Sequence, residues 1–417
     1  MKPSTPPHTA MQGPLAGVRV LDLTSVVLGP LATQILGDYG ADVIKVEGPE
    51  GDHARARGVT LHPGMASIYL AINRNKRSLA IDLKTEPGKE ILRRLIPTVD
   101  VVVHNMRVQA IDKLGFGYED VAALNPGIVY CAATGFDQSG PDRSKPAFDD
   151  IIQAACGLVA LNSVGREQPD YSPTLIADKT AGLAVVNSVL AALYHRERTG
   201  CGQYLEVPMF ETLVSFMLTE HLAGQTFAGA GLPGGYTRLL TGGRKPLRTK
   251  DGYVAILPYT ATHWRKFFES AERGDLADEY CVDNRQARSE NIPSMYRAMA
   301  QIASERTTAE LMDICAKMDI PATLIYGIDD LMAHPQLKAV SLFQTMEHPD
   351  VGTIRYVNPA TKFAATPASV RLPAPSLGQH TLELLGEAGY TEEQRALFLE
   401  NGIVFRDARS ESSSSSA

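Results

Sequence analysis

The sequence lacks the short motifs that define several large enzyme classes. No Gly-x-Gly-x-x-Gly follows the first predicted strand, so a dinucleotide-binding turn is not indicated. The chain also has no Gly-x-x-x-x-Gly-Lys-Ser/Thr loop, no Gly-x-Ser-x-Gly turn and no His-Glu-x-x-His segment. These absences exclude the familiar P-loop, serine-hydrolase and zinc-peptidase sites.

Cysteine is rare and dispersed. The 417 residues include five cysteines with no Cys-x-x-Cys spacing: Cys131, Cys156, Cys201, Cys281 and Cys315. An odd number at such wide separations argues against both a disulfide framework and a structural zinc site. We expect buried free thiols in a reducing, cytoplasmic compartment, and no metal site.

Charge of one sign and long apolar runs are also missing. The net charge is −7, with 44% hydrophobic and 21% charged residues, an ordinary globular composition. Neither nucleic acid nor a membrane is indicated as a partner, and no stretch approaches transmembrane length. Residues 1–14 lack the apolar core of a signal peptide, and the Ser-rich residues 407–417 predict a disordered tail. The expected class is a soluble cytoplasmic enzyme.

Alternating strand and helix patterns predict an α/β fold. An apolar strand at 18–23 precedes a helical pattern through Leu31 and Leu36, and a second strand follows at 42–47. Strand, helix and strand in this order form a βαβ unit, which requires a parallel sheet. The alternation continues with a helix at 88–96 and strands at 99–104 and 128–132. We predict a Rossmann-like open parallel sheet in a large domain.

A second, smaller α/β domain is expected, because the chain exceeds one typical hydrophobic core. A Gly-rich stretch at 228–249 predicts a mobile interdomain loop. Beyond it lie predicted strands at 252–258 and 320–326 and helices at 262–271, 293–303 and 309–318. The predicted layout is a large domain built from 1–225 and 336–406, with the small domain and its linker at 226–335.

Asp178 lies between the apolar run Leu175-Ile176-Ala177 and an apolar-periodic segment from Lys179 to Arg198. Two readings are open. Asp is a favoured N-cap residue, whose side chain accepts hydrogen bonds from first-turn amides. A carboxylate held against apolar walls is also a reactive oxygen nucleophile that can attack an activated carbonyl.

Five separated segments carry a family resemblance. They are Leu21-Asp22-Leu23 with Gly29-Pro30, Gly40 to Glu47, Asn75-Lys76-Arg77-Ser78, Thr199 to Gln203, and Ala374 to Thr381. In this order they resemble the class III CoA-transferases, the family of formyl-CoA transferase and the carnitine CoA-transferases, from Gly13 to Leu399. The resemblance implies coenzyme A or acyl-CoA as substrate without a tightly bound cofactor, a carboxylic acid acceptor, and a homodimer of interlocked chains.

The resemblance also assigns site residues. Ala177 to Gly182 occupies the place of the family's Gly-Asp-x-x-x-Gly segment, which makes Asp178 the covalent nucleophile. The large domain would bind CoA, with Val26, Val27 and Leu28 along the thioester and Ile81 near the nucleotide. The other implied CoA contacts are Asn105, Met106 and Arg107 in a turn at a strand end, and Lys113 and Lys145 at the phosphates. For each lysine the alternative is an ordinary solvated charge.

Two other functions stay open. Acyl-CoA racemases of the α-methylacyl type share the resemblance and use a His and an Asp as acid and base. Their His would fall at Phe148, which cannot carry a proton, although His53, His104 or His221 could still reach the site. The second alternative is a non-catalytic CoA-binding protein.

The acceptor pocket is the least defined feature. Four arginines in predicted loops could pair with the distal carboxylate of a dicarboxylate such as succinyl: Arg55, Arg57, Arg238 and Arg244. The alternative is that all four are surface charges. The family's glycine run that closes over the Asp has two candidates, Gly234-Gly235 and Gly242-Gly243, which could equally belong to a linker.

Overall fold

The computed structural model describes residues 12–240 and 243–406, and these divide into two compact units. The large unit contains the chain up to Asn162, Asp170–Met217, and the chain from Lys338 onward. The small unit contains Ser163–Pro169 and Leu218–Leu337. The predicted boundaries at 226 and 335 therefore shift, and 163–169 changes unit. Helix α9 (Met209–His221) runs across the first boundary, and helical periodicity gives no sign of where tertiary contacts change.

A seven-stranded sheet forms the centre of the large unit, in the order β12-β3-β2-β1-β4-β5-β6. Strands β1 to β6 run parallel, and β12 pairs antiparallel with β3. The strand bounds are β1 (Arg19–Leu23), β2 (Asp42–Glu47), β3 (Lys76–Ile81), β4 (Val101–His104), β5 (Val129–Thr134), β6 (Gln203–Pro208) and β12 (Val404–Phe405). The order 3-2-1-4-5-6 is that of the doubly wound dinucleotide-binding fold, so the α/β prediction is confirmed. Some boundaries differ by one or two residues: β4, for example, begins at Val101 and not at 99, and β5 extends to Thr134.

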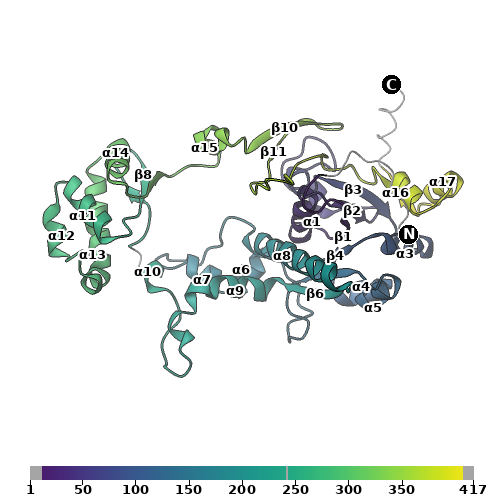
Figure 1. The fold of residues 1–417 in the computed structure, drawn as a ribbon, viewed down its shortest axis with the longest axis horizontal. Coiled ribbons are helices and arrows are strands. Elements are labelled where there is room, and N and C mark those ends of the chain that lie inside the picture. Colours follow the sequence, from purple (N-terminus) through teal and green to yellow (C-terminus); the bar gives the residue numbers. More distant parts are fainter. Residues whose placement is uncertain (1–11, 241–242, 407–417) are drawn as a thin grey trace. The chain divides into compact units, whose positions relative to one another are not determined.

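Helices cover both faces of this sheet (Figure 1). On one face, α1 (Leu28–Asp38) and α8 (Ile176–Thr199) share a core with alternate strand residues such as Val20 and Val103. On the other, the intervening residues Leu21 and Val102 pack with α3 (Glu86–Leu95), α4 (Val108–Leu114), α5 (Tyr118–Leu124) and α16 (Thr381–Glu387). Burial on both faces explains why strands such as β4 and β5 are almost entirely apolar.

The remaining elements of the large unit are short. They are η1 (His53–Ala56), α2 (Ser67–Ile72), η2 (Ile96–Thr98), α6 (Asp149–Ala155), α7 (Leu158–Asn162), α15 (Pro335–Ala339, which starts in the small unit), the antiparallel pair β10 (Phe343–His348) and β11 (Gly352–Val357), and α17 (Glu392–Glu400).

Helix α8 packs closely on α1. A Cβ added at Gly182 would lie 2.9 Å from the carbonyl oxygen of Leu28, so glycine is required for this approach. By length and composition α8 could cross a membrane, contrary to the expectation that no stretch reaches that length. Half of its apolar window is buried in the fold, which is the behaviour of a core helix. The close contact brings the N-terminal turns of α8 beside the start of α1.

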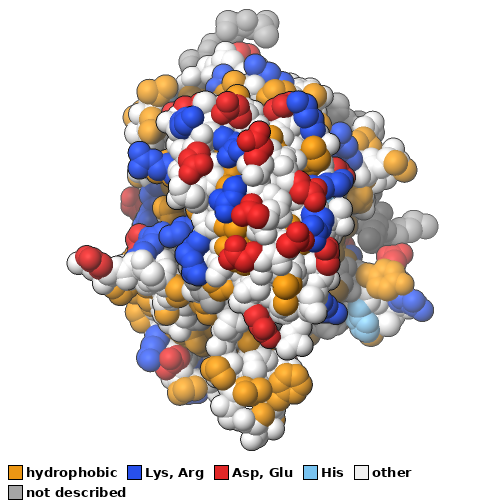
Figure 2. Space-filling model, turned by 90° about the vertical axis from the view of Figure 1, so that its left-hand side faces the viewer, with side chains coloured by type: hydrophobic (Ala, Val, Ile, Leu, Met, Phe, Trp, Pro, Cys, Tyr) orange, Lys and Arg blue, Asp and Glu red, His pale blue; other side chains and the backbone are white. Residues whose placement is uncertain are grey.

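The small unit has its own core. It has an antiparallel sheet of three strands: β7 (Leu247–Arg248), β8 (Tyr253–Ile256) and β9 (Ala322–Leu324). Four helices accompany this sheet: α11 (Ala261–Ser270), α12 (Gly274–Glu279), α13 (Arg285–Ser304) and α14 (Thr308–Met318). The predicted helix at 293–303 begins earlier, because Pro293 is accommodated inside α13. The unit also contains η3 (Ala223–Thr226), α10 (Thr237–Leu240) and η4 (Asp329–Ala333). Basic and acidic side chains are interspersed on the face in Figure 2.

The five cysteines are free, as expected, but they are not all buried. Cys131 and Cys315 lie in the cores, Cys156 is half-buried, and Cys201 and Cys281 are exposed. The expectation of uniform burial was wrong because Cys201 follows the helix-ending Gly200 and Cys281 lies in a turn after α12.

Candidate active site

A pocket opens where the strand order of the large sheet reverses, between β1 and β4. Its volume is about 340 Å³, within the range of small-molecule sites. The segments that follow these two strands, 25–28 and 105–108, line it together with residues after β5. Parallel sheets bind ligands at this reversal, outside the carboxyl ends of the strands. The topology therefore places the pocket before any side chain is considered.

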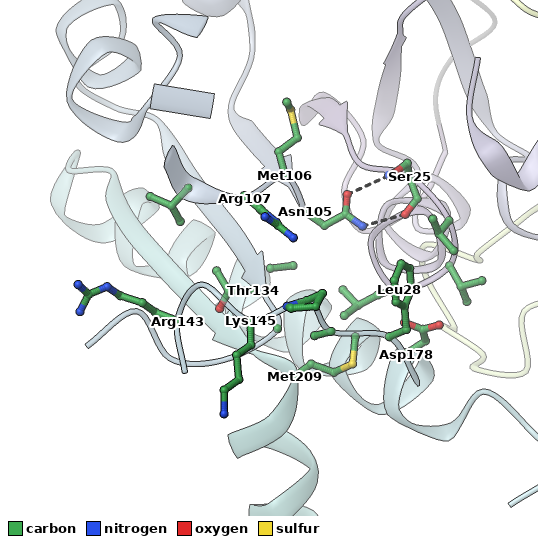
Figure 3. A pocket seen from close by; sticks show the side chains of 18 of the residues that line it. Ser25, Leu28, Asn105, Met106, Arg107, Thr134, Arg143, Lys145, Asp178 and Met209 are labelled. Atoms are coloured by element: carbon green, nitrogen blue, oxygen red, sulfur yellow. Dashed lines mark hydrogen bonds between the residues drawn. The ribbon is translucent and has the colours of Figure 1, made fainter. Parts of the chain in front are cut away.

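The segment after β1 is held in a strained conformation. Val26 has a φ of 71°, which is a true outlier for a β-branched residue. Its N–H donates to the carboxylate of Asp52 at 3.0 Å. Ser25 and Asn105 form a reciprocal pair, in which the Ser25 N–H donates to the Asn105 side chain at 3.0 Å and the Asn105 amide donates to the Ser25 carbonyl at 2.8 Å. Asn105 thus joins the two strand ends across the pocket (Figure 3).

Buried ion pairs support this turn from below. The Lys45 ammonium lies 2.8 Å from Asp52 and 3.1 Å from the Thr24 carbonyl oxygen. Lys76 pairs with Asp22 at 2.9 Å, and all four charged side chains are almost completely buried. Burial raises the pKa of Asp22, but Lys76 and Lys45 outweigh it and lower that pKa to about 2. The charged network fixes the backbone that lines the pocket.

Asp178 is the third residue of α8, and its side chain does not cap the helix. Leu175 occupies the N-cap position without a side-chain hydrogen bond. The N–H of Asp178 donates instead to the carboxylate of Asp149 at 2.9 Å, and Gln153 donates to the other oxygen of Asp149 at 2.6 Å. The N-cap reading of Asp178 is therefore wrong, and Asp149 performs that task from α6. The Asp178 carboxylate is left to face the pocket.

The Asp178 carboxylate is largely withdrawn from water. It is 9% exposed, and no hydrogen bond to it comes from the residues that the structure describes. Burial raises its pKa, Asp149 raises it further, Arg57 lowers it, and the result is about 7. Such a carboxylate is poorly stabilised in its charged form and is correspondingly reactive.

Cations line another part of the same pocket. Arg107, Arg143 and Lys145 are exposed and contribute to its wall. Lys145 also pairs with Asp142 at 2.8 Å on the surface. In Figure 3, Arg143 and Lys145 lie to one side, and Asp178 lies to the other beside Leu28. The pocket thus has a basic part, suited to phosphates, and an apolar part at Asp178.

The structure brings together most of the predicted site residues. Asp178 shares the pocket with seven others: Val26, Val27, Leu28, Asn105, Met106, Arg107 and Lys145. Two do not line it. Lys113 is exposed in the last turn of α4. Ile81 is 0% exposed in β3, where its side chain belongs to the core shared with α3 and α16 and does not reach the pocket surface.

The four arginines separate clearly. Arg55 is buried and binds both oxygens of Glu47 at 2.8 and 2.7 Å, so it cannot face an acceptor. Arg238 and Arg244 belong to the small unit. Arg57 is exposed in the large unit. Of the glycine candidates, Gly234 and Gly235 also lie in the small unit, whereas Gly242 lies outside the described residues.

Several residues of the site were missed. Asp149 does not line the pocket, but it accepts a hydrogen bond from the Asp178 N–H at 2.9 Å, and no sequence pattern singled it out. Phe148 lines the pocket and is 60% exposed. Of the three histidines, His53 lines the pocket, His104 is buried outside it, and His221 is in α9 beyond the unit boundary. Other unforeseen residues of the lining include Thr134, Gln138, Arg143 and Met209.

The described residues contain no cluster of three or more His, Cys, Asp or Glu side chains arranged to hold a metal ion. The polar groups of the pocket include a carboxylate, side-chain amides and cations. These are groups that bind and attack an activated acyl compound with anionic substituents.

The fold and the pocket define an α/β enzyme whose desolvated carboxylate adjoins a basic binding surface. The chain belongs to CoA-transferase family III, whose family model matches residues 15–381. It is 30% identical over 403 residues to succinyl-CoA:glutarate CoA-transferase of Homo sapiens, covering 94% of this chain and 90% of that one. It is 31% identical over 402 residues to succinyl-CoA–D-citramalate CoA-transferase of Chloroflexus aurantiacus, covering 94% and 98%.

The fold is also that of a solved relative. A CaiB/BaiF family protein from Brucella suis superposes with a TM-score of 0.77 at 29% identity, covering 90% of this chain and 100% of that one. Family and fold agree, and the chain is an enzyme of the CoA-transferase type.

Proposed function

We propose that the enzyme moves CoA from an acyl-CoA donor to a carboxylic acid through covalent intermediates on Asp178. The observation that carries the proposal is the Asp178 carboxylate itself: it faces the pocket, is 9% exposed, and has a pKa raised by burial to about 7. A carboxylate in this state gains more from attack on a carbonyl than a hydrated one does.

The proposed reaction begins with attack of an Asp178 oxygen on the thioester carbonyl carbon. The carbon–sulfur bond breaks, CoA leaves as the thiolate, and a mixed anhydride remains. The thiolate then attacks the aspartyl carbonyl carbon, which releases the donor carboxylate and forms an aspartyl-CoA thioester. The acceptor carboxylate attacks this thioester, and the thiolate returns to the acceptor acyl group of the new anhydride. Asp178 is regenerated, and the thioester energy is conserved without ATP.

The site's geometry suits these steps. The first turn of α8 favours negative charge at Asp178 through the helix dipole, which offsets part of the cost of burial. The apolar side chains of Val27, Leu28 and Met209 line the same pocket and limit the water that could hydrolyse an anhydride or thioester. Arg107, Arg143 and Lys145 are the groups we assign to the CoA phosphates.

The proposed donor is succinyl-CoA and the proposed acceptor is a dicarboxylate. The support is the activity of two relatives, which are a succinyl-CoA:glutarate and a succinyl-CoA–D-citramalate CoA-transferase. We further propose a cytoplasmic homodimer with interlocked chains, a state that light scattering and a crystal structure of the assembly would test.

The test of the nucleophile is Asp178→Ala. The variant should lose transfer by at least about four orders of magnitude while binding CoA in a calorimetric titration, since the basic residues are intact. Arg107→Ala is the complementary variant. It should weaken CoA binding but leave the rate of the reaction at Asp178 unchanged when the acyl-CoA donor is saturating. Turnover by Asp178→Ala near the wild-type rate would remove Asp178 from the mechanism.

The racemase alternative has one supporting observation, since His53 lines the same pocket as Asp178. Incubation with 2-methylacyl-CoA in deuterium oxide separates the two functions. The proposed transferase leaves the α-hydrogen in place, whereas a racemase exchanges it for deuterium.

A further inference from the structure

Arg57 follows the short helix η1 and lies next to the pocket. It is the C-cap residue of His53–Ala56, and its N–H donates to the carbonyl oxygen of Ala54 at 3.1 Å. His53, at the other end of this single turn, lines the pocket that contains Asp178. The backbone that carries Arg57 is therefore continuous with the pocket wall.

Buried contacts fix the segment that precedes Arg57. Asp52 caps η1 by accepting from the Ala54 N–H at 2.9 Å, and it is paired with Lys45. Arg55 is anchored by Glu47 and its guanidinium lies 3.9 Å from the centre of the Tyr69 ring. The two arginines two residues apart thus have opposite environments: Arg55 is buried and paired, and Arg57 is exposed on a well-anchored backbone.

The Arg57 guanidinium has no partner in the described residues, where no carboxylate pairs with it and no hydrogen bond to it is formed. Its charge nevertheless reaches the active carboxylate. Burial and Asp149 raise the pKa of Asp178, and Arg57 lowers it. An unpaired guanidinium within electrostatic range of the reacting group is a ready receptor for a second anion.

We infer that Arg57 binds the distal carboxylate of dicarboxylic acyl groups and acceptors, and so selects dicarboxylates over monocarboxylates. The inference rests on the proposed function and names the residue that decides its substrate class. The reacting carboxylate would lie at Asp178, the methylene groups against the apolar wall, and the distal carboxylate on the fork of Arg57. The cations that line the pocket, Arg107, Arg143 and Lys145, remain available to the CoA phosphates.

The experiment compares two acceptors of equal chain length, glutarate and pentanoate, with succinyl-CoA as the common donor. Because both reactions share one donor, an effect of the variant on the donor half-reaction cancels in the ratio of the two values of kcat/KM. The variants are Arg57→Met, which keeps the chain length and removes the charge, and Arg57→Lys, which keeps the charge and removes the fork. Arg198→Met is the matched control, about 30 Å along α8 from Asp178.

The expected result is that Arg57→Met lowers the glutarate-to-pentanoate ratio of kcat/KM by on the order of 10- to 100-fold. Arg57→Lys should recover part of the ratio, and Arg198→Met should match the wild type. Equal losses for both acceptors would overturn the inference, because Arg57 would then act on Asp178. An unchanged ratio would overturn it too.

Failure of the proposed function is visible separately. Intact-mass spectrometry of the wild type with succinyl-CoA reports whether the CoA adduct forms at all. An adduct with no effect of Arg57 on the ratio refutes the specificity role alone, whereas no adduct and no transfer refutes the function on which it rests.

Discussion

The raised pKa of Asp178 predicts that the active carboxylate destabilises the folded enzyme at neutral and alkaline pH. The perturbation is Asp178→Asn, which keeps the size of the side chain and removes its charge. Folded Asp178 has a pKa of about 7 against an ordinary value of 3.8, so the folded state holds this proton more tightly than the unfolded state does. Stability should therefore fall as pH rises from about 4 to about 7 and then level off.

The magnitude follows from linkage. Each pH unit between the two pKa values corresponds to 1.36 kcal/mol, so the ionised Asp178 costs about 4 kcal/mol above pH 7. At pH 5 roughly 1.7 kcal/mol of this cost is present, because the unfolded carboxyl is already mostly ionised. Asp178→Asn should thus be more stable than the wild type, and its advantage should grow by about 2.5 kcal/mol between pH 5 and pH 8.

The assay is urea unfolding at the two pH values, followed by circular dichroism. The single tryptophan, Trp264, lies in the core of the small unit, so its fluorescence reports that unit separately. Asp150→Asn is the control, since Asp150 is exposed and contributes least to the raised pKa of Asp178. An advantage of Asp178→Asn that is the same at pH 5 and pH 8 would refute the reasoning, because the carboxyl would then titrate near its ordinary value.

Three further predictions concern the residues around Asp178. Asp149→Asn removes the largest charge effect that raises the pKa of Asp178. The acid limb of the plot of rate against pH, which lies near pH 7 in the wild type, should therefore shift to lower pH by about one unit. A pH profile identical to that of the wild type would contradict this prediction. Val26→Gly relieves a backbone strain of about 1 kcal/mol but makes the turn after β1 more flexible. The melting temperature should therefore stay the same or rise, while kcat falls. A large loss of stability would show that packing of the Val26 side chain outweighs the backbone strain. Lys45→Met leaves Asp52 buried without a cation and should lower the free energy of unfolding by about 3–5 kcal/mol, measured by urea unfolding, with Lys84→Met as an exposed control.

The sequence predicts the large sheet well because its strands are buried on both faces. The run 128–132 is apolar throughout and the run 42–47 has an apolar centre, and the helices between the strands are long enough for parallel crossovers. Strand β12 was not foreseen, since its two residues, Val404 and Phe405, carry no periodicity. The order of the strands, and hence the position of the pocket between β1 and β4, follows from tertiary packing that local patterns do not encode.

Residue roles were predictable only in part. The local pattern at Asp178 left both capping and catalysis open. The choice between them depends on Asp149, which is remote in sequence and accepts a hydrogen bond from the backbone N–H of Asp178 at 2.9 Å. Arg55 and Arg57 look alike in sequence, but Glu47 from a neighbouring strand end buries the first and leaves the second exposed. In each case the answer is a side-chain contact that local sequence patterns do not show.

The most direct test of the central claim is peptide mass spectrometry of enzyme mixed with succinyl-CoA and quenched with hydroxylamine. An aspartyl anhydride or thioester reacts with hydroxylamine to give a hydroxamate, so the account predicts this modification on Asp178 and none in the absence of donor. A protein that turns over succinyl-CoA but carries no hydroxamate at Asp178, or carries it at another carboxylate, would contradict the covalent role assigned to this residue.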